Sequence, residues 1–145
     1  MKFEYETGKI PDILDIAPLI PEFESLLTSD VIEARLQGKR NLILVAKHED
    51  KPIGFKIGYE VFSNQFYSWL GGVIPCYRKM KVASKLRSIQ ESWAKENGFE
   101  SISVKSMNRF PAMLQMLIAS GYQMSGYEDR GSVSTSKINF IKVLV

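Results

Sequence analysis

The sequence predicts an α/β (α+β) fold in which a mixed, mostly antiparallel central sheet is flanked by helices. Several short segments alternate apolar and polar residues, or are continuously apolar, as strands are. Other segments repeat apolar residues at helical spacing. Their order is strand, two helices, three strands, helix, strand, helix and two strands, which places a β-α-β unit among antiparallel strands. This order favours a mixed sheet over a doubly wound parallel one.

The N-terminal third predicts one strand and a broken helix. Residues 2–7 alternate as a half-buried strand does. Residues 10–38 have helical character, but Pro21 interrupts it. Thr28 and the two residues after it offer a new N-cap, and Gly38 ends the second helix.

Three consecutive strands are predicted next. Residues 42–46 form a short apolar run, residues 49–52 a turn, and residues 53–61 alternate cleanly. The third strand, 66–74, contains Gly71 and Gly72. A glycine pair inside a strand indicates a bulge or the close approach of another backbone or a ligand.

The C-terminal half predicts a helix over 81–96, a strand over 101–107 and a helix over 111–120. The helix over 111–120 is so rich in apolar residues that we expect it to be buried on most sides. Two last strands, near 122–128 and 137–144, flank a polar loop at 128–136.

Composition bounds the class of protein. A chain of 145 residues with 45% apolar residues fits one domain spanning 1–145. One cysteine and one histidine are too few for a zinc site, so no metal is expected. The start of the chain lacks the apolar core of a signal peptide, and no apolar run is long enough for a bilayer. We therefore expect a cytoplasmic protein without membrane contact, and a net charge of +3 is too weak to indicate nucleic acid.

One segment has the character of an anion site. After the glycine-containing strand, a basic loop leads into the helix that begins near residue 81. A helix start leaves backbone N–H groups unpaired and carries partial positive charge, which favours phosphate. Arg78, Lys79 and Lys81 add whole charges, and Val82 to Ser84 are small or short. On physical grounds alone, this segment is either an anion site or a solvated basic turn.

The same segment resembles the acetyl-CoA signature of the GNAT superfamily of N-acetyltransferases. Residues 73–86 read Val-Ile-Pro-Cys-Tyr-Arg-Lys-Met-Lys-Val-Ala-Ser-Lys-Leu, like a strand ending in Val-x-Pro followed by Tyr-Arg and Arg/Gln-x-x-Gly-x-Gly/Ala. Asn108 before the next helix, and Gly121-Tyr122 after it, resemble the superfamily's second landmark. The order of elements also agrees, so the resemblance covers nearly the whole chain and implies a GNAT-like acyl-CoA N-acyltransferase fold.

The resemblance implies a cofactor site. Acetyl-CoA would be the co-substrate, with its pantetheine arm where the strands at 66–74 and 101–107 splay apart. Backbone groups near Gly72 and Val73 would bond that arm and polarise the thioester, and Asn108 would bond the cofactor from the other side. The pyrophosphate would lie on the amides of the helix start: Arg78, Lys79, Met80, Lys81, Val82, Ala83 and Ser84.

Two departures from the superfamily pattern stand out. Lys81 occupies the usual position of the first glycine, where its side chain would either crowd the loop or reach a cofactor phosphate. Leu117 occupies the usual position of a tyrosine general acid, so we expect it to contribute packing and no chemistry.

Two residues are candidates for the general base that frees the amine. Glu60 is on the polar face of a predicted central strand, and Tyr67 matches the spacing of a strand position that holds a glutamate in some family members. The alternatives are a surface carboxylate for Glu60, packing for Tyr67, and a water chain that replaces both.

The leading hypothesis is direct acetyl transfer from acetyl-CoA to a primary amine in a ternary complex. A non-catalytic acyl-CoA-binding module is the alternative, because the usual tyrosine is absent, and a nucleic-acid binder is a third and weaker one. The acceptor, a small molecule or a peptide, would be shaped by residues 21–30 and the loop at 128–136. A homodimer is compatible with the sequence.

Overall fold

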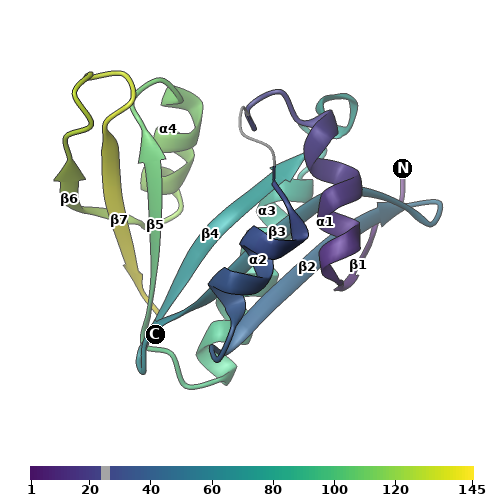
Figure 1. The fold of residues 1–145 in the computed structure, drawn as a ribbon, viewed down its shortest axis with the longest axis horizontal. Helices are drawn as coiled ribbons and strands as arrows, with labels where there is room; N and C mark the ends of the chain where they lie inside the picture. The colour runs from purple at the N-terminus through teal and green to yellow at the C-terminus, as the bar shows by residue number, and fades with distance from the viewer. Residues whose placement is uncertain (24–26) are drawn as a thin grey trace.

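The computed structural model describes residues 1–23 and 27–145. The described residues form one seven-stranded sheet in the order β1-β2-β3-β4-β5-β7-β6 (Figure 1). Neighbouring strands are antiparallel except for β4 and β5, which are parallel. The predicted fold class and order of elements are confirmed. The strands are β1 Glu4–Thr7, β2 Asn41–His48, β3 Lys51–Phe62, β4 Gln65–Val73, β5 Ser101–Met107, β6 Gln123–Glu128 and β7 Lys137–Val143.

Helices lie on both faces of this sheet. The α-helices are α1 Ile10–Ile16, α2 Ser29–Leu36, α3 Val82–Glu96 and α4 Pro111–Ala119, and short 3-10 turns η1 Ala17–Leu19 and η2 Pro75–Tyr77 follow α1 and β4. Helices α1 and α2 lie over one face of the sheet, and α3 lies behind it (Figure 1). None of the helices in the described ranges is long and apolar enough to cross a membrane.

The predicted break between the first two helices has the expected cause. Helix α1 is continued by η1 only as far as Leu19. Helix α2 starts anew where the Thr28 side chain accepts a hydrogen bond from the Val31 amide at 3.3 Å, as an N-cap does. Gly38 then takes a φ of 72°, which glycine adopts without strain.

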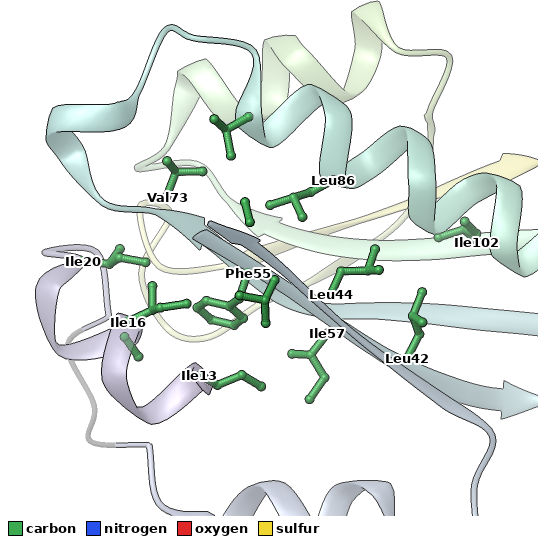
Figure 2. Packing of buried hydrophobic residues seen from close by; sticks show 14 of the residues in the cluster. Ile13, Ile16, Ile20, Leu42, Leu44, Phe55, Ile57, Val73, Leu86 and Ile102 are labelled. Atoms are coloured by element: carbon green, nitrogen blue, oxygen red, sulfur yellow. The ribbon is translucent and has the colours of Figure 1, made fainter. Parts of the chain in front are cut away.

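The core lies on both faces of the central strands. Ile13, Ile16 and Ile20 surround Phe55 on one side of the sheet, and Leu86 of α3 lies on the other (Figure 2). Phe55 and Leu86 are 0% and 1% exposed, so each contributes about 1.5–3 kcal/mol by burial.

Two predictions of detail were wrong. Pro52 was assigned to a turn, but it pairs with Lys47 inside β3, because the turn is the tighter Glu49-Asp50, with both residues at positive φ. Helix α4 is not buried on most sides: Leu117 is buried, but Met113 and Ile118 are 42% and 52% exposed. Only one side of α4 faces β5, and its composition could not show this.

Candidate functional site

The sheet divides where β4 leaves β5. The two strands pair only from Gln65 with Ser101 to Ser68 with Val104. Beyond that point β4 pairs only with β3, and β5 only with β7, so the sheet opens as a V (Figure 1). Trp69, the next residue of β4, is an extra residue opposite β3, because Leu70 pairs with Ile57 and Ser68 with Gly58. The bulge and the divergence therefore coincide.

The ladder determines which backbone groups face this divergence. The Ile74 amide donates to the Ile53 carbonyl at 2.9 Å. Bonded and non-bonded pairs alternate along antiparallel strands, so Gly72 exchanges its bonds with Phe55. The backbone groups of Gly71 and Val73 then point away from β3, toward the side that β5 has left. Of the two predicted positions, Val73 faces the divergence by this alternation and Gly72 does not.

Gly72 has a steric role instead. A Cβ at Gly72 would lie 2.7 Å from Ile20 Cδ1 and 3.3 Å from Phe23 Cε2. The residue is small because the segment after η1 packs directly onto this part of β4.

The loop before α3 is shaped by two lysines in the left-handed region. Lys79 and Lys81 have φ values of 64° and 67°, a conformation that costs a non-glycine residue about 1–2 kcal/mol. Lys81 is the N-cap of α3 and takes this left-handed conformation. A glycine is usual at this signature position because glycine adopts that conformation without strain. The Lys81 side chain is exposed.

The N-terminus of α3 is open to an anion. Its N-cap makes no side-chain hydrogen bond, and the bond that enters the helix runs from the Lys85 amide to the Lys81 carbonyl at 3.0 Å. The amides of Val82, Ala83 and Ser84 belong to the first turn, where helix geometry supplies no intrahelical acceptor. Three amides and the helix dipole therefore converge where the sequence predicts a phosphate.

Arg78 is held by contacts with other residues of the protein. Its amide donates to the Pro75 carbonyl at 3.1 Å, and its Nε donates to the Val73 carbonyl at 3.1 Å. Its two terminal nitrogens bind the Glu22 carboxylate at 2.9 and 2.7 Å, and the guanidinium lowers the pKa of Glu22. Arg78 therefore links the segment after η1 to the end of β4. The backbone amides that are open to an anion come later in the chain, in the first turn of α3.

A polar cluster lies between the middle of α3, the end of α4 and β7. Glu91 accepts hydrogen bonds from Tyr122 at 2.9 Å and Lys142 at 2.8 Å. Arg87 lies 3.8 Å from Glu91 and donates to Met116 Sδ of α4 at 2.9 Å. Sequence reasoning missed Arg87, although it lies on α3 one turn after the predicted site.

Lys56 is a second residue that sequence reasoning missed. It belongs to β3 and pairs with Gly71 on the face that α3 covers. Burial lowers the pKa of Lys56 to about 8, repulsion from Arg87 adds to this, and Glu91 opposes it. The signal was a charge between Gly54 and Gly58 in the middle of a central strand.

Glu60 lies away from the divergence. It pairs with Phe66 near the β3–β4 hairpin, at the end where β4 and β5 are still joined. Its carboxylate accepts hydrogen bonds from Arg40 Nε at 3.3 Å and Nη2 at 3.2 Å, and Arg40 also donates to Asn97 O and Ser63 O. These contacts give Glu60 a structural role in closing the hairpin.

Tyr67 lies at the divergence, on the face that α1 and α2 cover. Its ring meets Tyr59 edge to face at 5.5 Å. Burial raises the pKa of Tyr67 to about 12; Tyr59 and Glu128 raise it too, and Arg35 lowers it. Tyr67 is therefore a neutral phenol at physiological pH, a donor of hydrogen bonds and not a ready base.

Asn108 and Leu117 have defined contacts. The Asn108 side-chain amide donates to the Val133 carbonyl at 2.9 Å, which fixes the loop after β6 to the end of β5. Leu117 is 2% exposed within the core, so its expected packing role is confirmed. Part of the predicted acceptor segment, residues 24–26, lies outside the described residues.

Solved structures share this architecture. The ribosomal-protein-S18-alanine N-acetyltransferase from Escherichia coli matches with a TM-score of 0.86 at 12% identity, covering 99% of this chain and 94% of that one. Ard1 from Thermoplasma volcanium matches with a TM-score of 0.87 at 15% identity, covering 100% and 99%. A GNAT family acetyltransferase from Elizabethkingia anophelis with acetyl-CoA bound matches with a TM-score of 0.77 at 14% identity, covering 99% and 97%.

Sequence comparison finds no such neighbours, since no family model and no curated protein matches the chain significantly. The agreement with solved structures nonetheless extends over nearly the full length of both partners. The chain has the fold of the GNAT acetyltransferases.

Proposed function

We propose that this protein is an acetyl-CoA-dependent N-acetyltransferase that moves the acetyl group to a primary amine by direct transfer in a ternary complex. The observation that carries the proposal is the coincidence of the Trp69 bulge with the point where β4 leaves β5. Thirteen residues after Trp69, the same chain forms the open N-terminus of α3 at Val82. Strand β4 thus offers backbone groups to an extended ligand, and the start of α3 offers an anion site farther along the same ligand.

The cofactor fits the residues that are present. Its diphosphate would lie on the amides of Val82, Ala83 and Ser84, with Lys79, Met80 and Lys81 forming the preceding turn. Its pantetheine arm would follow the backbone groups of Gly71 and the amide of Val73, which face the divergence, since the Val73 carbonyl already accepts a hydrogen bond from Arg78. Arg78 supports the turn through Glu22 and Val73, and Asn108 lies at the end of β5 across the divergence.

The thioester supplies an activated acyl group with a good leaving group, since thiols have pKa values near 8.5. The protein's part is to position the amine and to donate hydrogen bonds to the carbonyl oxygen, where charge develops. The amides of Gly71 and Val73, which point away from β3, suit this role, because they are fixed before the reaction begins. In this proposal Tyr67 acts on the side of the acceptor amine as a neutral hydrogen-bond donor. Glu60 has only its structural role in the β3–β4 hairpin.

Cofactor binding is tested by thermal unfolding with acetyl-CoA. A ligand at 100 times its Kd stabilises the folded state by about 2.7 kcal/mol, which should raise the melting temperature by a few degrees. Ala83→Glu should abolish the shift, because it places a carboxylate against the diphosphate. Ser92→Glu adds the same charge to an exposed position of the same helix and should keep the shift.

Catalysis is tested separately by the release of free CoA against a panel of polyamines, amino acids, aminoglycosides and peptide N-termini. Release that depends on an amine supports the transferase. Binding of acetyl-CoA without transfer to any amine would instead identify a non-catalytic acyl-CoA-binding module.

A further inference from the structure

Four cations gather on the face of the sheet that α1 and α2 cover, beside the divergence of β4 and β5. We call them the basic cluster: Arg35, Lys105, Arg130 and Lys137. The strand register places Lys137 opposite both Met107 and Glu128, and Lys105 two residues before Met107. Arg130 follows β6 and shares the carboxylate of Glu128 with Lys105, at 3.0 and 2.9 Å. Arg35 reaches the same region from α2.

The charges of the basic cluster are poorly balanced. Among the described residues, Glu128 is the carboxylate in contact with it, and that carboxylate is divided between Lys105 and Arg130. Arg35 donates to the neutral hydroxyl of Tyr59 at 2.9 Å. Within the described part of the chain, the Lys137 ammonium has neither an ion pair nor a hydrogen bond. Burial lowers the pKa of Lys137, repulsion from Arg130, Lys105 and Arg35 adds to this effect, and attraction to Glu128 opposes it. Bound negative charge would relieve that repulsion.

The basic cluster adjoins Trp69 of the bulge and Tyr67 just before it. The Arg35 guanidinium lies 4.8 Å from the centre of the Trp69 ring, and the Lys105 ammonium lies 5.9 Å from the centre of the Tyr67 ring. The open N-terminus of α3 lies on the opposite face of the sheet (Figure 1). An acceptor that reaches the divergence from the α1–α2 side must therefore pass these cations.

Positive charge at this place selects among amines. A di- or polycationic amine is repelled, whereas an amine with its own anionic group is attracted. The same cations favour the uncharged form of an ammonium held near them, which is the form that attacks a thioester.

We propose that the acceptor is a primary amine that also carries an oxyanion, a carboxylate or a phosphate, which Lys137 and its neighbours in the basic cluster bind. The inference rests on the proposed acetyltransferase function and narrows its substrate class.

The test uses matched pairs of acceptors that differ in the oxyanion. Suitable pairs are β-alanine with β-alaninamide, phosphoethanolamine with ethanolamine, and a tripeptide amide beginning with aspartate with the same peptide beginning with asparagine. Rates are corrected for the fraction of free amine. In at least one pair the anionic member should have a kcat/KM about tenfold higher or more, as a charge-assisted hydrogen bond provides. The pair that responds distinguishes a carboxylate, a phosphate and a peptide source.

Lys137→Gln should bring the ratio of kcat/KM within that pair toward one, and Lys137→Glu should reverse it. Lys51→Gln removes an exposed lysine at the β2–β3 turn and should leave the ratio as it was. Added salt should reduce the wild-type ratio more than that of Lys137→Gln.

Equal kcat/KM values within every pair would overturn the inference while leaving the transferase in place, as would a preference that survives Lys137→Glu. Failure of acetyl-CoA to shift the melting temperature, or absence of transfer to every amine tested, would instead remove the proposed function and this inference with it.

Discussion

Lys56 and Gly71 face each other across β3 and β4: the Lys56 ammonium lies 3.6 Å from the position that a Cβ on Gly71 would take. The pair stands on the α3 side of the divergence, beside Arg87 and Glu91. The lysine side chain runs along the Gly71 backbone, and burial disfavours its charge there.

Lys56→Met should stabilise the protein at pH 7. The pKa of Lys56 falls from 10.5 to about 8 in the folded state. The unfolded chain therefore binds more protons between these values, and stability rises with pH through that window. Below pH 8 both states are protonated and the full penalty applies, about 3 kcal/mol at most. In urea denaturation, Lys56→Met should have a higher free energy of unfolding than the parent at pH 7. That free energy should not rise between pH 8 and 10.5.

Lys51→Met in the same strand is the control, because its lysine is exposed. It should leave the pH dependence of stability as in the parent. A rise between pH 8 and 10.5 that persists in Lys56→Met would assign the effect to another group.

Gln90→Leu should also stabilise the fold. Gln90 lies in α3 with 0% exposure, and neither atom of its amide has a partner among the described residues. A buried polar group without a hydrogen bond costs about 1–3 kcal/mol, and leucine of similar size removes that cost. Denaturant unfolding measures the gain, and Gln115→Leu, on the exposed side of α4, should change stability by less than about 0.5 kcal/mol. A loss of stability in Gln90→Leu would show that the amide has a partner after all.

The alternation of residues 53–61 and the glycines near 71 located the central strands, because strand period and turn residues act locally. The sequence could not reveal that the buried stripe of α3 runs through Gln90 and Ala94, with Ile89 and Trp93 at its margin. A helix of apolar and small residues fits several rotations, and the sheet beneath it selects one.

The anion site could be located because unpaired amides at a helix start follow from the chain alone. The general base could not, because its role depends on long-range partners. Glu60 has the right residue type and strand face, but Arg40 binds it from twenty positions away. The basic cluster escaped notice for the same reason: α2, β5, β7 and the loop after β6 contribute one cation each.

Lys81→Gly tests the departure from the usual glycine. Relief of the left-handed φ of 67° should raise stability by about 1 kcal/mol. If the lysine also contacts a phosphate, acetyl-CoA affinity should fall and become less sensitive to salt. Lys79→Gly is the matched variant, with φ of 64°, and should show the stability gain as well. Tighter binding in Lys81→Gly would mean that the side chain only crowds the turn.

The last prediction separates Tyr67 from Glu60 by their pH dependence. Because the pKa of Tyr67 is about 12, its phenol stays neutral from pH 7 to 10 and cannot take a proton as tyrosinate. Tyr67→Phe should therefore lower kcat by about tenfold or more through the loss of a positioned donor, with the same pH profile as the parent. Glu60→Gln should keep kcat and lose up to about 1 kcal/mol of stability, because it weakens the contact with Arg40. Both variants are assayed from pH 7 to 10 with an identified amine. If raising the pH restores Tyr67→Phe to the parental rate, Tyr67 was the base. If Glu60→Gln loses activity at pH 7 and regains it near pH 10, the carboxylate acts in proton transfer despite its place in the hairpin.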